Sequence, residues 1–287
     1  IAVLKKYFSN DKLIKVVKLK GGVSHNVSLI TTNTTNGGQR TLVLKCFEGF
    51  EWKNAANHSS VSLEKSVKFT LAKDVRVPKT FFLDNSLAIL STPYFIMDFI
   101  EGDTKAELSS FPERVRTMAL FLASLHKINT KDFTHLQMEN LESPLEGCFE
   151  FLPKITGIEN SYKMKENTNL VLNHGDFWPN NIIWKDKEIA AVIDWEDASL
   201  GDPMADFATA RIELFCMYGK DVTDLFSEEY LKESKFDTRN LPIWEIYAST
   251  SAIVTMDSWG LEEQDRLKRL GAATIYLNYT IKNFLLN

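Results

Sequence analysis

The chain has 287 residues, of which 44% are hydrophobic and 25% are charged, as in globular proteins that bury a large core. It contains no run of about 18 apolar residues, which argues against a membrane-spanning helix, and its start lacks the charge-then-apolar order of a secretory signal. Its three cysteines are odd in number and far apart, which argues against a disulfide framework and predicts a cytoplasmic protein.

The net charge of −5 is unevenly distributed along the chain. Residues 1–100 contain 14 Lys and Arg against 7 Asp and Glu, whereas residues 101–287 contain 19 against 31. A basic first part would attract phosphates and an acidic second part would attract a cationic substrate, although solvated surface charge without a partner is the plainer interpretation. No basic stripe typical of nucleic-acid binding rises above this background.

Residues 15–47 predict the beginning of a small sheet. Their apolar and polar residues alternate, as in half-buried strands. Gly21-Gly22 favours a turn within this stretch, and Asn36-Gly37-Gly38 favours a tight hairpin before the strand TLVLKCF. We therefore expect antiparallel strands joined by short turns.

A helix and two further strands are expected next. Apolar residues at helical spacing predict a helix over residues 59–73, which Pro78 would end. Residues 78–86 and 88–100 then predict two strands, joined by a turn at Asp84-Asn85. The first third of the chain thus predicts a small sheet with one helix.

Glu101-Gly102-Asp103 interrupts this pattern and is the expected boundary between a first domain, residues 1–100, and a second, residues 101–287. Beyond it, apolar residues line one face of a helix from about Pro112 to Lys127. Short strands are expected at VLN, NIIW and AAVID, and helices dominate from Met204 onward. The pattern predicts an α+β protein with a small sheet and a larger, mainly helical part.

Residues 171–208 are the most informative stretch. Asp176 lies in HGD, Asn181 follows it closely, and Asp194 ends the apolar run AAVID. Loops at the ends of strands often carry catalytic groups, because the strands hold them in place. A base, an amide ligand and a metal carboxylate are the groups that a magnesium-dependent phosphoryl transferase needs.

The same stretch resembles the aminoglycoside phosphotransferase and choline kinase-like family, the small-molecule relatives of the protein kinases. HGDFWPNN resembles the family's catalytic loop, and IDWEDASLGDPMADFA resembles its metal-binding segment. A long match with fixed spacing is a specific signal. The resemblance implies a two-lobed, protein kinase-like α+β fold that transfers a nucleotide's γ-phosphate to a hydroxyl.

The resemblance assigns roles to three polar side chains of this stretch. Asp176 is the expected catalytic base, which accepts or orients the proton of the substrate hydroxyl. Asn181 and Asp194 are expected to hold Mg²⁺, because oxygen ligands suit this hard cation. Trp195-Glu196 follows Asp194 where protein kinases have Phe-Gly, which favours a small-molecule substrate.

Four further polar residues are expected to be structural. By resemblance, His174 bonds the backbone around the metal carboxylate, and His126 is a packed helix residue. Asp202 and Asp206, in GDPMAD, are expected to brace the loops through backbone N–H groups rather than to touch the substrate.

The strand TLVLKCF carries the expected phosphate contact. Because side chains alternate along a strand, Val43, Lys45 and Phe47 share one face, which would place Val43 against a base and Lys45 at the phosphates. By resemblance, Lys45 is the family's phosphate-contacting lysine and Glu64 is the carboxylate that holds it in place. An exposed helix carboxylate is the alternative interpretation of Glu64, but the whole set of matched residues favours its pair with Lys45.

Two backbone segments complete the expected nucleotide site. The turn from Lys20 to Asn26 falls where kinases cover the phosphates, and Ser24 could donate to one of them, although an ordinary hairpin explains the turn equally well. By resemblance, the segment with Asp98, Phe99 and Ile100 is a hinge, near residues 97–102, whose backbone bonds the purine edge. Side chains matter little there, so ATP and GTP both remain open.

The acceptor is expected to be a small hydroxylated molecule, with a cationic amine as one option and Glu213, Glu245 or Asp257 as candidate partners. Relatives phosphorylate aminoglycosides, macrolides, choline or ethanolamine, homoserine, methylthioribose or ketosamine-linked sugars. A pseudokinase acting as a binding module and a metal-dependent hydrolase are the alternatives from other classes. The sequence does not indicate an oligomeric state.

Overall fold

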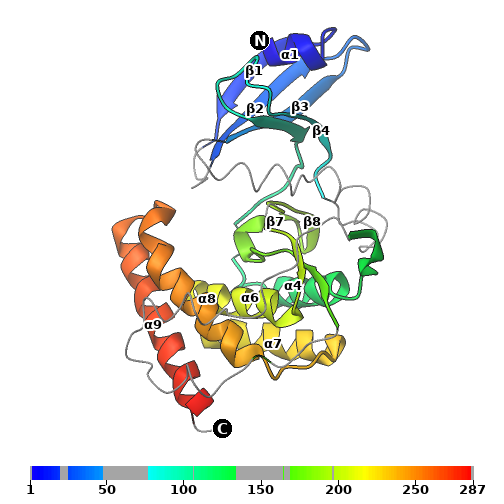
Figure 1. The fold of residues 1–287 in the computed structure, drawn as a ribbon. Helices are drawn as coiled ribbons and strands as arrows, with labels where there is room; N and C mark the ends of the chain where they lie inside the picture. Colours follow the sequence, from blue (N-terminus) through cyan, green and yellow to red (C-terminus); the bar gives the residue numbers. More distant parts are fainter. Residues whose placement is uncertain are drawn as a thin grey trace.

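The first part of the chain forms a five-stranded antiparallel sheet in the computed structural model (Figure 1). The strands lie side by side in the order β1-β2-β3-β5-β4. Their bounds are β1 Lys12–Lys18, β2 His25–Asn33, β3 Gln39–Phe47, β4 Thr80–Asp84 and β5 Tyr94–Asp98. The structure describes residues 2–19, 25–47, 77–105, 107–133, 164, 169–195 and 197–285.

A short helix, α1 (Ala2–Tyr7), packs against the sheet on the side away from the helical part (Figure 1). Val3 and Leu4 of this helix are buried against Leu42 and Ile96. Because side chains alternate along β3, Leu42 points toward α1, whereas Val43 and Lys45 point toward the opposite face of the sheet. The sheet thereby has one face for its own core and one face for a site.

The second part of the chain is mainly helical and contains the larger core. Its helices are α4 (Pro112–Leu125), α6 (Pro203–Tyr218), α7 (Lys220–Ser234), α8 (Leu241–Thr255) and α9 (Glu263–Leu285). Helix α6 is central, because it packs against α7, α8 and α9. Short 3₁₀ helices lie at Thr130–Phe133, Pro179–Asn181 and Met256–Trp259.

Two small antiparallel ribbons pack against α4 and α6. Strand β6 (Val171–Asn173) pairs with β9 (Ser199–Gly201), and β7 (Ile182–Lys185) pairs with β8 (Glu188–Val192). Each ribbon buries most of its side chains, so the loops between the strands are held at fixed positions.

The link between the two parts is bonded to the second ribbon. Asp103 and Trp184 exchange two backbone hydrogen bonds, of 2.9 and 2.8 Å. Gly102 has a φ of 159°, and a Cβ there would lie 2.5 Å from the side chain of Ile183. The link therefore passes too close to β7 for any residue larger than glycine.

The predicted α+β, kinase-like architecture is confirmed, with a small antiparallel sheet followed by a mainly helical part. The hairpin between β2 and β3 and the helix that begins at Pro112 are also confirmed. The predicted helix over residues 59–73 and the Gly21-Gly22 turn lie outside the described residues.

Two expectations about the strands need correction. The strand expected over residues 88–100 begins only at Tyr94, because residues 85–93 form a loop that is anchored by Asp84 bonding to Ser86. Strand β8 ends at Val192, so Asp194 lies beyond the strand rather than at its end. Helix α1 and strand β9 were not expected. Among the described residues, no helix is long and apolar enough to span a membrane.

Candidate functional site

The turn after β6 joins two of the predicted site residues. Asn181, in the 3₁₀ helix that follows the turn, donates its side-chain N–H to both the carboxylate Oδ2 and the backbone oxygen of Asp176, each at 2.9 Å. The amide nitrogen is thereby committed to Asp176, and the amide oxygen of Asn181 makes neither of these bonds. An amide held in this way can present its oxygen to a cation.

Asp194 lies just after β8 and faces the sheet. Its Oδ1 accepts from the Nζ of Lys45 at 2.6 Å, which joins strand β3 to the helical part. Asp194 has a φ of 67°, a left-handed conformation that costs energy for most residues other than glycine and is tolerated best by Asn and Asp. Strained backbone of this kind is typical of residues held for function.

His174 connects the loops of Asp176 and Asp194. Its Nε2 donates to the backbone oxygen of Ile193 at 2.9 Å, and its Nδ1 accepts from the backbone N–H of Asp176 at 3.2 Å. These two bonds require the neutral tautomer with its proton on Nε2, because a protonated ring has no acceptor. His174 therefore holds the two loops together, as its structural role in the resemblance implied.

Beneath the turn, the carboxylate of Asp206 accepts from two successive backbone N–H groups. The N–H of His174 lies 2.6 Å from Oδ2, and the N–H of Gly175 lies 2.8 Å from Oδ1. Gly175 has a φ of 86°, and a Cβ there would lie 2.2 Å from the backbone oxygen of Asp197. Only glycine fits this turn.

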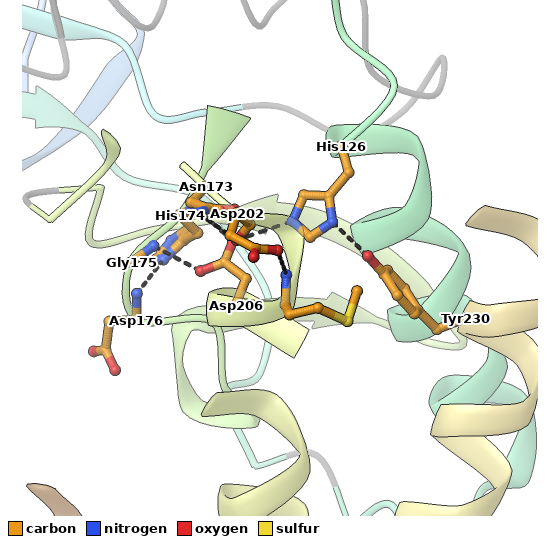
Figure 2. Close-up of polar contacts among 9 residues, drawn as sticks. His126, Asn173, His174, Gly175, Asp176, Asp202, Asp206 and Tyr230 are labelled. Carbon is orange, nitrogen blue, oxygen red and sulfur yellow. Dashed lines mark hydrogen bonds and ion pairs between the residues drawn. The ribbon is translucent and has the colours of Figure 1, made fainter. Parts of the chain in front are cut away.

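Buried polar contacts continue from Asp206 into the helices (Figure 2). His126, which caps the C-terminal end of α4, lies 3.5 Å from Asp206 through Nε2 and 2.7 Å from the hydroxyl of Tyr230 through Nδ1. Asp202 caps α6 by accepting from the N–H of Met204 at 3.0 Å. We call Asp206, His126, Tyr230 and Asp202 the supporting network. The bracing roles expected for the two aspartates match this geometry.

Figure 2 shows the carboxylate of Asp176 directed away from the supporting network. Burial, together with the nearby charge of Asp194, raises the pKa of Asp176 to about 6, whereas His174 in its protonated form and the bond from Asn181 oppose the shift. We call Asp176, Asn181, Asp194 and Lys45 the reactive set. Its two carboxylates and one amide are a donor set suited to a hard divalent cation, which would also relieve the repulsion between the carboxylates.

The remaining predicted nucleotide contacts are placed only in part. Val43 is half-buried on β3 opposite Met97, and Phe99 is 39% exposed after β5. Ile100 is buried against Ile183. The backbone N–H of Asp98 donates to the oxygen of Lys79 at 2.9 Å and so is committed within the sheet.

Ser24 and Glu64 lie outside the described residues, so the expected pair of Lys45 with Glu64 stays a prediction. The contact of Lys45 with Asp194 was not expected from the sequence, since 149 positions separate the two residues. The requirement for glycine at position 175 was also missed. The HGD motif was its only signal.

Each of the three acidic residues considered for a cationic acceptor has an arginine partner. Glu245 accepts from Arg211 at 2.7 Å, and Asp257 accepts from Arg266 at 2.7 Å. Glu213 lies 3.7 Å from Arg269. None of the three is therefore an isolated negative charge.

A family model described as the phosphotransferase enzyme family matches residues 15–244. A probable acyl-CoA dehydrogenase from Arabidopsis thaliana is 28% identical, over 82% of this chain and 31% of that protein. Acyl-CoA dehydrogenase family member 11 from Homo sapiens is 24% identical, over 55% of this chain and 23% of that protein. The chain thus spans less than a third of the length of these curated relatives.

Solved structures share the fold at low identity. A putative aminoglycoside phosphotransferase from Ralstonia eutropha has a TM-score of 0.69 at 14% identity, covering 98% of both chains. The GDP and kanamycin complex of APH(2″)-IIIa has a TM-score of 0.67 at 15% identity, covering 98% of this chain and 97% of the other. Because the family model matches most of its length and these structures share its architecture, the chain belongs to the phosphotransferase enzyme family.

Proposed function

We propose that this protein is a magnesium-dependent phosphotransferase that moves the γ-phosphate of ATP or GTP to a hydroxyl of a small molecule. The observation that carries this proposal is the convergence of the reactive set. Asn181 bonds Asp176, Lys45 bonds Asp194, and His174 fastens the two loops to each other. Phosphoryl transfer depends mainly on positioning and charge neutralisation, which such a set provides.

Each member of the reactive set has a separate task in this proposal. Asp176 accepts the proton of the acceptor hydroxyl, and Asn181 keeps its carboxylate in one orientation. The oxygens of Asn181 and Asp194 bind Mg²⁺, which supplies charge neutralisation at the phosphates when bound. Lys45 contacts the phosphates, and its ion pair with Asp194 keeps this long side chain ordered beside the metal ligand.

The nucleotide base lies between the sheet and β7 in this proposal, with Val43 against it. Because the N–H of Asp98 is committed to Lys79, the backbone of Phe99 and Ile100 is left to bond the purine edge. Ser24 and Glu64 are retained as expected phosphate and lysine partners. Residues 1–100 would be the nucleotide-binding lobe and residues 101–287 the catalytic and acceptor lobe, acting in the cytosol.

Asp194→Asn tests the metal role with little disturbance of the fold, because Asn tolerates the positive φ at this position. We expect the Mg²⁺ concentration that gives half-maximal activity to rise about tenfold or more. The assay follows nucleoside diphosphate release and detects the phosphorylated acceptor by mass spectrometry, with ATP and GTP in parallel.

Asp186→Asn is the matched control for this experiment, because Asp186 is exposed and also has a positive φ, of 57°. An unchanged Mg²⁺ requirement in Asp194→Asn would remove Asp194 from the metal site. Inorganic phosphate as the sole product, with every acceptor unmodified, would favour the hydrolase alternative. A protein that neither binds Mg²⁺–nucleotide nor turns it over would favour the pseudokinase alternative.

A second acceptor class is favoured by the curated relatives. Their names describe acyl-CoA dehydrogenases, and this chain aligns with under a third of each of the two described above. The matched part is therefore a minor portion of proteins whose names describe acyl-CoA dehydrogenases. Hydroxylated acyl compounds belong in the acceptor panel beside aminoglycosides, amino alcohols and sugars.

A further inference from the structure

Glu213 on α6 and Arg269 on α9 form a buried but incompletely bonded pair. Their residues are 8% and 7% exposed, and Arg269 Nη1 lies 3.7 Å from Glu213 Oε2. Within the described part of the chain, Glu213 Oε2 and Arg269 Nε and Nη1 are inaccessible and make no hydrogen bond, although Nε lies 3.3 Å from Asp265. Buried polar groups are nearly always hydrogen-bonded, so a buried ion pair in which three polar atoms make no hydrogen bond needs a reason.

The position of the pair connects it with the proposed site. Glu213 follows Asp206 by seven residues on α6, which is two helical turns, so both side chains lie on the face toward the 174–176 turn. Burial, together with the charge of Asp176, raises the pKa of Glu213 to about 7 against the opposing charge of Arg269. Glu213 is therefore within electrostatic reach of the proposed catalytic base.

A second ion pair on α6 shows what a structural pair looks like in this protein. Arg211 Nε donates to Glu245 at 2.7 Å, the hydroxyl of Tyr276 donates to the same carboxylate at 2.5 Å, and Ser227 accepts from Arg211. These charges are bonded on several sides, as buried charges require. The pair of Glu213 and Arg269 differs because three of its polar atoms make no hydrogen bond, and a bound ligand would supply the missing partners.

We propose that Glu213 and Arg269 bind the acceptor, and that they select a hydroxylated molecule bearing a carboxylate or carbonyl oxygen over a polycation. The unbonded atoms are inaccessible in this structure, so the two side chains would have to turn toward the acceptor on binding. The guanidinium N–H groups of Arg269 would then donate to that oxygen, and the carboxyl of Glu213 would bond a polar group beside it. Because the pKa of Glu213 is raised to about 7, its carboxyl is partly protonated near neutral pH, whereas Arg269 stays charged. The positive charge of the pair therefore predominates, which favours a carboxylate and disfavours an ammonium group. This inference rests on the proposed phosphotransferase function and assigns it an acceptor class.

A matched acceptor series tests the inference. Hydroxycarboxylates, their uncharged methyl esters and amino alcohols of equal chain length are compared with kanamycin, with the wild-type protein and Mg²⁺–ATP. The readouts are kcat/KM and, with a non-hydrolysable ATP analogue, calorimetric affinity. We expect the carboxylate and ester to be preferred over the amino alcohol by about tenfold or more.

Two substitutions should shift this preference in opposite directions. Arg269→Gln removes the donor charge and should reduce the preference for the carboxylate about ten- to a hundredfold. Glu213→Gln removes the competing negative charge and should strengthen that preference. Arg266→Gln is the control, because Arg266 is on the same helix and also pairs with acidic residues, at the surface. A purely structural pair would lower all acceptors equally in both variants.

Preference of the wild-type protein for kanamycin or the amino alcohols would overturn the inference, as would an unchanged ranking in Arg269→Gln. Absence of binding by the whole series would overturn it as well. Failure of the proposed function has a different signature, because Mg²⁺–nucleotide would then produce no thermal shift and no turnover with any acceptor. Should Arg269→Gln fail to fold, Glu213→Gln and the wild-type ranking still decide the question.

Discussion

The two sides of the 174–176 turn differ in how well their polar groups are hydrogen-bonded and in how strained their backbone is. Below the turn, the supporting network is buried, and Asp206 bonds two backbone N–H groups and approaches His126. Above it, the reactive set combines a carboxylate of raised pKa at Asp176 with a positive φ at Asp194. The comparison teaches that the hydrogen-bonded supporting network holds the reactive set in place. By itself, the reactive set would not keep the strained backbone of Asp194 and the repulsion between its two carboxylates.

The comparison predicts that substitutions in the reactive set greatly reduce activity while the protein still folds. Asp176→Asn keeps the size of the side chain and removes the proposed base. We expect turnover to fall about a hundred- to ten-thousandfold, while Mg²⁺–nucleotide affinity changes little. Steady-state kinetics and a thermal-shift titration measure both, with Asp186→Asn as control. Unchanged turnover would contradict the assignment of Asp176.

Substitutions in the supporting network should instead lower the stability of the fold, and activity should fall as a consequence. Asp206→Ala leaves the N–H groups of His174 and Gly175 without their acceptor. We expect the free energy of unfolding to fall by about 2–5 kcal/mol, measured by urea denaturation. Asp224→Ala at an exposed ion pair is the control and should change it by less than about 0.5 kcal/mol.

Gly175 connects the two sides, so its substitution sharpens the comparison. In Gly175→Ala the new Cβ would collide with the backbone of Asp197, and the positive φ would be strained. We expect a loss of about 1–3 kcal/mol in unfolding free energy, together with reduced turnover because Asp176 shifts. Gly219→Ala serves as control, since its φ is 84° but no atom lies within 4 Å of the added Cβ. Equal losses in both variants would show that backbone strain alone is responsible.

The smallest expected effect is the pH dependence of stability without Mg²⁺. The pKa of Asp176 is about 6 in the folded protein against an ordinary value of 3.8, so the folded state binds the proton more tightly. This contribution is complete below about pH 4 and is lost as the pH rises through about 6. Above about pH 6 we expect the free energy of unfolding of Asp176→Asn to exceed that of the wild type by on the order of 1 kcal/mol, measured by denaturation at several pH values. A constant difference between the two proteins across that range would contradict it.

The sequence by itself determined the fold class, the tight hairpin and the helix at Pro112, because alternation and helical spacing are local signals. It also predicted Asp176, Asn181 and Asp194 as site residues, because they belong to motifs that lie close together in the sequence. Glu64 and Ser24, named by the same resemblance, stay predictions.

Only the tertiary structure decided how these groups meet. The ion pair of Lys45 with Asp194, the neutral tautomer of His174 and the open pair of Glu213 with Arg269 each join residues from different elements. No local pattern encodes such contacts, because they depend on how helices and strands pack in space. A sequence motif can fix which groups are present, but burial and distance fix their charge, their partners and the ligand that they can accept.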